Sequence, residues 1–492
     1  MASAAPPSAA TRPGPRLRAS MEPSNEPHQA SSHDPRPGAQ QGPEASAAAF
    51  SGLASSIVCG GCGTIVDASE PYPFRCPRAG DGGDHVLRRV LDISRLHFAL
   101  DDSEPNPFVR WRGLFHSYHL GAAHGMSDQA FVEVVRGLDD EVAKLDGHGF
   151  SVTPFACSPE LAGRLGTGAS IWVKDETGNV SGSHKARHLF GLLVHLEVVR
   201  RLGMAQGTEP LAIASCGNAA LAAAVVAAAG RRRLLVFVPT DAEPAVVDRL
   251  RSLGAEITVC PREQGVAGDP TYHRLQAAIA NGALPFTCQG NENGLAIEGG
   301  ETLGYEMAAA LADQRGLDHV VIQVGGGALA SAVAQGLSEA VAFGVLASMP
   351  RVHTVQTAGA WPLARALEKV AARLPANAGP TEVREAVQYA ASHRADFMWP
   401  WETVPHSLAH GILDDETYDW VALVEAMLAT GGQALIVDED EIAEANVLGA
   451  EATGIGVDPT GSAGLAGLAR LCRRGDVGQG ERAAVLFTGA RR

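Results

Sequence analysis

Lys185 is the residue of this sequence best placed for covalent chemistry. It follows a turn of Ser181, Gly182 and Ser183 and opens a stretch with helical periodicity. The positive end of a helix favours the uncharged amine of a lysine, which is a nucleophile. A lysine that is simply exposed to solvent is the alternative interpretation.

A glycine run farther along the chain has the properties of a phosphate-binding loop. Consecutive glycines let several backbone N–H groups point at one phosphate, and the dipole of a following helix adds its positive end. The run follows the apolar stretch HVVIQV and consists of Gly325, Gly326 and Gly327, with Ala328 and Leu329 after them. A glycine run alone is weak support, so its weight depends on the other loops.

Two more loops offer polar groups directly after an apolar stretch. Backbone N–H groups at a helix start can hold a substrate carboxylate, and an asparagine amide can donate to a phenolic oxygen. The segment concerned is Ser215, Cys216, Gly217, Asn218 and Ala219. At the far end, AAVLFTG delivers Thr488, whose hydroxyl can hydrogen-bond a ring nitrogen. An ordinary asparagine near a helix start and a strand cap are the alternatives.

Short apolar runs alternate with longer helical stretches from about residue 165 onward. Examples are IWVKDE before HKARHLFGLLVHLEVVRRLG, and LAIAS before GNAALAAAVVAAAG. Strand, helix and strand at this spacing imply right-handed crossovers and a mainly parallel sheet covered on both faces. We therefore predict an α/β fold. Its ligands would bind at the carboxyl ends of the strands, where all four loops lie.

Length and charge narrow the possible functions. The 492 residues suggest two or three domains, and 46% apolar with 19% charged residues is typical of a globular protein. A net charge of -16 argues against nucleic acid as a partner. Residues 211–230 lack charge, but their polar interruptions and many alanines favour a buried strand and helix over a membrane span. The scattered cysteines indicate a reducing cytoplasm.

Taken together and in this order, the four loops resemble those of the fold-type II pyridoxal-phosphate enzymes. This family includes threonine synthase, threonine dehydratase, serine racemase and the tryptophan synthase β subunit. The resemblance covers roughly residues 105–492 and implies two α/β subdomains with the cofactor in the cleft between them. It also implies that pyridoxal 5'-phosphate forms an internal aldimine, a Schiff base, with Lys185. Asn218 would face its 3-hydroxyl, the glycine run its phosphate, and Thr488 its pyridine nitrogen.

Several further segments resemble threonine synthase. They are Trp111-Arg112, Thr153-Pro154, residues 289–306 and residues 458–464. The lysine motif departs from that enzyme, because His184 and Ala186 flank the lysine where threonine synthases usually have Phe and Asp. The resemblance thus implies a divergent branch whose leaving group and acceptor can differ from phosphate and water.

The resemblance implies a lyase-type enzyme of amino-acid metabolism that carries out β- or γ-replacement or elimination on a small amino acid. Threonine synthase-like replacement and a serine/threonine ammonia-lyase, which yields a 2-oxo acid, both stay open. A catalytically silent relative that binds a protein partner is the alternative from another class, but such a module does not need all of the loops described above. Oligomers are common in the family, so we expect a homodimer.

The N-terminal part of the chain divides into two segments. Residues 1–50 are rich in Ala, Pro, Ser, Gly and Gln, which predicts a disordered tail. Residues 51–104 form a small cysteine-bearing segment, a possible zinc ribbon. Three thiolates and one imidazole would make a tetrahedral structural site from Cys59, Cys62, Cys76 and His85. A degenerate knuckle that packs as a small hairpin without metal is the alternative.

Residues 406–418 hold several other possible metal ligands, namely His406, His410, Asp414, Asp415 and Glu416. Acids at a helix start and a solvated loop are the preferred interpretation. A lid that faces the substrate is the alternative, because functional loops often have this composition.

Overall fold

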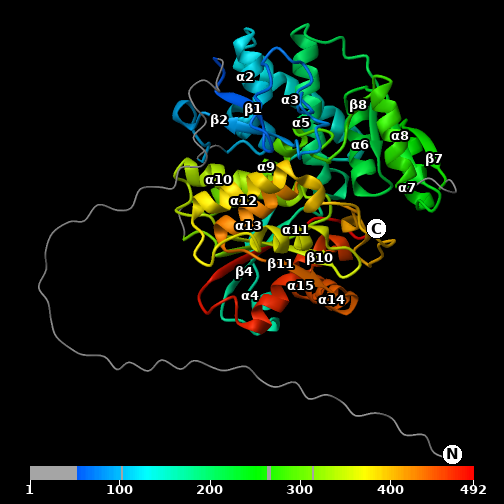
Figure 1. Cartoon of the computed structure of the whole chain (residues 1–492). Helices are drawn as coiled ribbons and strands as arrows, with labels where there is room; N and C mark the ends of the chain where they lie inside the picture. The colour runs from blue at the N-terminus through cyan, green and yellow to red at the C-terminus, as the bar shows by residue number, and fades with distance from the viewer. Residues whose placement is uncertain (1–51, 101–102, 263–267, 313–314) are drawn as a thin grey trace, which may run out of the picture. The chain divides into compact units, whose positions relative to one another are not determined.

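The computed structural model describes residues 52–100, 103–262, 268–312 and 315–492 (Figure 1). The predicted tail, residues 1–50, lies outside the described residues. Among the helices of the described ranges, none is both long and apolar enough to cross a membrane.

The larger sheet has six strands in the order β11-β10-β9-β12-β4-β3. All neighbours run parallel except β3, which pairs antiparallel with β4. The strands are β3 (Phe155–Cys157), β4 (Ser170–Asp175), β9 (His319–Gln323), β10 (Arg351–Thr357), β11 (Ala434–Val437) and β12 (Arg482–Phe487).

Alternation along the central strands of this sheet places side chains in two separate apolar layers. Val320 and Ile322 of β9 belong to the cluster that includes α10 and α13. Val321, which points the other way, belongs to the cluster that includes α15. Both faces are therefore covered, as the continuous apolar runs predict for parallel strands. The covering helices are α10 (Ala328–Ala342), α11 (Pro362–Ala371), α13 (Trp420–Thr430), α14 (Glu439–Thr453) and α15 (Pro459–Arg474).

The smaller sheet has four parallel strands in the order β7-β6-β5-β8. Leu211 and Ile213 of β5 pack with the alanine-rich α6, whereas Ala212 packs with the layer of α8. The predicted strand and helix over residues 211–230 are thereby confirmed as β5 and α6. The elements are β5 (Leu211–Ala214), β6 (Leu234–Pro239), β7 (Glu256–Cys260), β8 (Leu284–Pro285), α6 (Asn218–Ala229), α7 (Pro244–Ser252) and α8 (Pro270–Ala280).

Two long buried helices, α5 (Lys185–Arg201) and α9 (Ala296–Ala310), join the layers of the two sheets. Helix α9 packs against α10 and against α5, the helix that begins at Lys185. In Figure 1 the α9–α10 pair lies to the left of α6, α7 and α8 and above α14 and α15. The predicted α/β architecture with parallel sheets is confirmed.

The cysteine-bearing segment folds as an antiparallel hairpin. Its strands are β1 (Ser55–Cys59) and β2 (Leu87–Leu91); β1 ends at a cysteine, and the chain between the strands holds two more. The remaining helices are α1 (Pro107–Arg110), α2 (His116–Ala123), α3 (Asp128–Asp146), α4 (Pro159–Arg164) and α12 (Pro380–Ser392).

Candidate active site

The loop that follows β4 leads into α5, and Lys185 is the first residue of that helix. Ser181 and Gly182 both have left-handed backbone conformations, with φ of 56° and 67°. The Asn179 side chain donates to the Ser183 carbonyl over 3.0 Å and closes the turn. A left-handed non-glycine residue is uncommon and costs conformational energy, so surrounding contacts must hold this loop.

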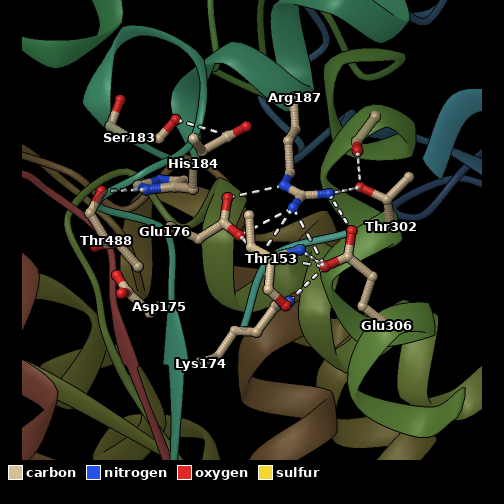
Figure 2. A network of polar contacts seen from close by, with 12 residues as sticks. Thr153, Lys174, Asp175, Glu176, Ser183, His184, Arg187, Thr302, Glu306 and Thr488 are labelled. Carbon is tan, nitrogen blue, oxygen red and sulfur yellow. Dashed lines mark hydrogen bonds and ion pairs between the residues drawn. The ribbon is translucent and has the colours of Figure 1, made fainter. Parts of the chain in front are cut away.

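A fully buried polar network lies behind this loop (Figure 2). The Arg187 guanidinium donates to Glu176 over 2.8 Å and to Glu306 over 2.6 Å. Lys174 donates to the Thr153 carbonyl over 2.7 Å and also pairs with Glu306. Two cations therefore face two carboxylates, and the network is formally neutral. Because Arg187 follows Lys185 by two residues, the network fixes the first turn of α5.

The charges in this network hold one another in the ionised form. Burial opposes ionisation of Glu306, yet Arg187 and Lys174 hold its pKa below the usual value. Burial lowers the pKa of Lys174, although Glu306 and Glu176 oppose the change. Of this network, Thr153 and Glu306 lie in segments that resemble threonine synthase. The members belong to different elements, and no local pattern predicts that they pair.

The end of β12 runs beside the Lys185 loop. Ser183 forms a bridge with Gly489, and the His184 ring lies 3.4 Å from the Thr488 carbonyl (Figure 2). The Thr488 side chain is buried, and its hydroxyl accepts a hydrogen bond from Gln323 over 2.7 Å. Gln323 ends β9, so the loops after β4, β9 and β12 meet at one edge of the larger sheet.

Asn218 opens α6 directly after the loop of residues 215–217. Its side-chain oxygen accepts a hydrogen bond from Arg492, and the same guanidinium donates to the Ser181 carbonyl over 2.8 Å. Arg492 therefore connects the Asn218 loop to the Lys185 loop. The neighbouring Cys216 is half-buried, and burial raises the pKa of its thiol, which agrees with a spacer and not with a nucleophile.

The glycine run after β9 is packed so closely that each glycine is required. A Cβ atom at Gly325 would lie 2.9 Å from the Cα of Ile412, and one at Gly326 would lie 2.7 Å from the Tyr418 ring. Gly327 has φ of 107° and caps α10. The loop therefore presents backbone N–H groups at the positive end of a long helix, the arrangement that binds anions.

The segment that covers this loop belongs to residues 406–418, together with Asp419 after them. Asp414 is partly buried and accepts a hydrogen bond from the Gly326 N–H. Loss of water raises the pKa of Asp414, while nearby Lys185 and the Gly326 N–H oppose that rise. The preferred interpretation of Asp414 as an acid of a solvated loop is thus wrong, because it lies against the glycine loop. The contacts agree with the lid alternative.

Asp419 is a second acid of this segment and the more deeply buried one. Among the described residues, neither of its carboxylate oxygens has a hydrogen-bond partner. Burial raises the pKa of Asp419 to about 8; Asp84 adds to the shift and Lys185 opposes it. The sequence search missed this residue, which looked like an ordinary acid before a helix.

The four predicted metal ligands lie together in the hairpin segment. The Cys62 and Cys76 sulfurs are 3.7 Å apart, and the Cys59 sulfur lies 3.6 Å from Nδ1 of His85. All four ligand atoms lie within 4.8 Å of one another. The other ring nitrogen of His85 hydrogen-bonds Asp81 over 2.6 Å, so a carboxylate orients the ring.

The structure is an α/β protein in which a lysine, a glycine loop at a helix start and a buried hydroxyl follow three strands of one sheet. Comparison with known proteins agrees with this class. The model of the family "Pyridoxal-phosphate dependent enzyme" matches residues 148–489. This is more than half of the chain, and the protein belongs to that family.

The individual relatives share little sequence identity with this chain. A threonine synthase of Methanocaldococcus jannaschii is 25% identical over 342 residues, which cover 68% of this chain and 74% of the relative. An L-serine dehydratase of Saccharomyces cerevisiae is 28% identical over 208 residues, covering 41% of this chain and 60% of the relative. The solved structure of threonine deaminase isoform 2 from Solanum lycopersicum aligns with a TM-score of 0.53. It is 17% identical, with 74% of this chain and 86% of that one covered.

The residues present fit pyridoxal phosphate. The glycine loop can receive a phosphate, since its N–H already binds the Asp414 carboxylate. Lys185 lies close enough to that carboxylate to affect its pKa. The Thr488 hydroxyl and the Asn218 amide come from the neighbouring loops. Each role assigned from the sequence stays a prediction.

Proposed function

We propose that this protein carries out β- or γ-replacement or elimination on a small amino acid, with Lys185 as the residue that holds pyridoxal 5'-phosphate. The observation that carries the proposal is the position of Lys185 at the start of α5, close enough to affect the pKa of Asp414, the acid that faces the Gly326 N–H. A lysine on an unrelated surface would have no reason to lie near an anion-binding loop.

Each loop has a defined task in this proposal. When bound, the cofactor withdraws electrons and makes the Cα proton of an amino acid acidic. The Lys185 amine is then free to move that proton. Backbone N–H groups of residues 215–219 bind the substrate carboxylate, and the Asn218 amide donates to the cofactor's 3-oxygen. The N–H groups of residues 325–329 bind its phosphate.

Two reactions are compatible with this arrangement. Relatives named threonine synthase and L-serine dehydratase both align with the chain. We place threonine synthase-like replacement first and a serine/threonine ammonia-lyase second. A 2-oxo acid product from serine or threonine identifies the lyase. We also expect a homodimer in the cytoplasm, and light scattering on the purified protein tests the dimer.

The visible absorption spectrum of the purified protein tests the central claim. Lysine-bound pyridoxal phosphate should give a yellow band, and one of O-phosphohomoserine, threonine, serine, O-acetylserine or cysteine should shift it. Lys185→Ala should abolish the band, whereas Lys144→Ala, an exposed lysine on α3, should keep it. If the wild-type protein shows no band after addition of pyridoxal phosphate, a catalytically silent relative becomes the better description.

We also propose that the hairpin segment binds one structural zinc ion. The spacing between the Cys62 and Cys76 sulfurs supports this, since two thiolates about 2.3 Å from a tetrahedral zinc lie at a comparable separation. Cys62→Ser should remove zinc from the purified protein, and Cys157→Ser, an exposed cysteine, should not. Mass spectrometry for metals measures the content. Less than a tenth of an equivalent in the wild-type protein would favour the metal-free hairpin.

A further inference from the structure

Gln323 is a buried amide at the junction of the loops that would surround the cofactor ring. It is the last residue of β9, two positions before the glycine loop, and is 3% exposed. Its Nε2 atom lies 2.8 Å from the Gly461 carbonyl, 3.2 Å from the Leu486 carbonyl and 2.7 Å from the Thr488 hydroxyl. One amide nitrogen therefore serves three oxygens.

The chemistry of these partners fixes the orientation of the amide. Two of the three are carbonyl oxygens, which only accept hydrogen bonds, so the atom that faces them must be the NH₂ group. The opposite orientation would place an amide oxygen against two carbonyl oxygens. It follows that the Thr488 hydroxyl accepts a hydrogen bond from Gln323.

A threonine hydroxyl has one proton to donate and lone pairs with which to accept. Gln323 uses a lone pair of Thr488, and the proton is not committed to any described residue. The Gly461 and Leu486 carbonyls accept from the same amide nitrogen. Gln323 thus engages the Thr488 oxygen as an acceptor and leaves its proton for a partner on the other side.

We propose that Gln323 is a positioning residue that holds the Thr488 hydroxyl as a hydrogen-bond donor toward the pyridine nitrogen of pyridoxal phosphate. The inference rests on the proposed function, in which Thr488 meets that nitrogen. An unprotonated pyridine nitrogen is an acceptor only, so a hydroxyl fixed as a donor matches it. Gln323 would therefore act on the ring nitrogen through the Thr488 hydroxyl.

Removal of the amide has a specific consequence. In Gln323→Met the side chain keeps its length and loses its donors, so nothing holds the Thr488 oxygen as an acceptor. The Thr488 hydroxyl can then rotate and turn its proton away from the ring. The variant should bind pyridoxal phosphate roughly two- to tenfold more weakly than the wild-type protein, the range expected for one hydrogen bond.

The test combines two measurements on the full-length protein. One is the dissociation constant of pyridoxal phosphate for the apoprotein, from titration of the visible band. The other is the ¹⁵N NMR shift of labelled pyridoxal phosphate, which reports the hydrogen bond to the ring nitrogen and is insensitive to general destabilisation. Thr488→Val should lose the hydrogen-bonded shift, and Thr488→Ser should keep it.

A double-mutant cycle separates positioning from an independent effect. Gln323→Met should move the ¹⁵N shift toward that of Thr488→Val, and should weaken binding no further in the Thr488→Val background. Gln335→Met, a part-buried glutamine of α10 that donates to the Arg89 carbonyl, is the matched control and should change neither reading. Gln323→Leu replaces the methionine variant should that variant not fold.

The outcomes distinguish this inference from the proposed function. If the wild-type protein binds no cofactor through Lys185, the proposed function fails and the inference fails with it. If the cofactor binds but Gln323→Met leaves the ¹⁵N shift unchanged, or its effect on affinity adds fully to that of Thr488→Val, only the positioning role is overturned.

Discussion

Asp414 places a negative charge at the loop to which the proposed function assigns the negatively charged cofactor phosphate. Its carboxylate accepts a hydrogen bond from the Gly326 N–H, and that N–H belongs to the loop proposed to bind the cofactor phosphate. Two anions cannot share one donor without repulsion. Binding of the cofactor must therefore displace Asp414 or protonate it, and the raised pKa of this acid makes protonation easier.

Asp414→Asn should consequently bind pyridoxal phosphate more tightly, by roughly tenfold, because the amide carries no charge. Wild-type affinity should also approach that of the variant as the pH falls, since a raised pKa means that Asp414 becomes neutral earlier than an ordinary aspartate. Titration of apoprotein at several pH values measures both effects.

Asp415→Asn is the matched control, because Asp415 is adjacent and also has a raised pKa, and the groups that shift this pKa do not include the glycine loop among the described residues. The two variants should differ clearly. Equal gains in both would mean that general charge, and not displacement from the Gly326 N–H, limits binding.

At the scale of elements, the backbone of α9 packs very closely against α5 and α10, the two helices that begin at the site. A Cβ atom at Gly191 of α5 would lie 2.9 Å from the Cα of Gly299. On the other side, a Cβ atom at Gly304 would lie 2.9 Å from the Cα of Gly336 on α10. These glycines therefore set the spacing between the helix that begins at Lys185 and the helix that begins after the glycine loop.

Gly304→Ala should destabilise the protein by about 1–3 kcal/mol, because a methyl group would force α9 and α10 apart. Gly137→Ala is the control in α3, where a Cβ atom would meet nothing within 4 Å. There the alanine should stabilise by about 0.5–1 kcal/mol through helix propensity. Urea unfolding measures both, and a neutral Gly304→Ala would show that the helices can separate without cost.

The network behind Lys185 supports a second prediction at this scale. Glu176→Gln leaves two buried cations with one carboxylate and should cost about 3–5 kcal/mol, as expected when one member of a buried ion pair is lost. Lys174→Met in addition restores neutrality, with Arg187 and Glu306 still paired. The double variant should therefore be less destabilised than the sum of the single variants, and simple additivity in urea unfolding would argue against charge balance as the organising feature.

The same network shows which parts of the site the sequence could predict. Lys185 and the glycine run are recognisable because turn residues, glycines and a following helix are adjacent in the chain. Arg187 and Glu306 are 119 residues apart, and nothing in the sequence shows that they pair. Asp414 was misjudged because acidic neighbours suggested a solvated loop. Such contacts depend on how β4, α5, α9 and the covering segment pack, which no spacing reveals.

At the scale of the whole molecule, a chain of hydrogen bonds links three strands of the larger sheet at the edge opposite the site. The Gln433 N–H donates to Nδ1 of His353 over 3.2 Å, so Nε2 of His353 carries the proton. That nitrogen lies 3.0 Å from Nδ1 of His319, whose Nε2 lies 3.1 Å from Glu481. All donors and acceptors are matched only while His353 is neutral.

The stability of the protein against acid should depend on this chain. Burial lowers the pKa of His353 from 6.5 to about 4, and nearby His319 and Arg351 act in the same direction, with Asp476 opposing them. The unfolded chain therefore takes up this proton near pH 6.5, and the native protein takes it up only near pH 4. The contribution of neutral His353 is complete above pH 6.5 and is lost progressively as the pH falls toward 4.

His353→Gln isolates this contribution, because a glutamine can still accept from the Gln433 N–H and donate to His319 but does not titrate in this range. The free energy of unfolding of the wild-type protein, relative to that of the variant, should fall by up to about 3 kcal/mol between pH 7 and pH 4. Comparison at each pH cancels the contributions of the carboxyl groups with raised pKa, such as Asp84 and Glu298. Protonation of these groups stabilises the folded protein as the pH falls. Parallel urea-unfolding curves for the two proteins across this range would mean that His353 titrates alike in the folded and unfolded states, so that its burial does not contribute to acid sensitivity.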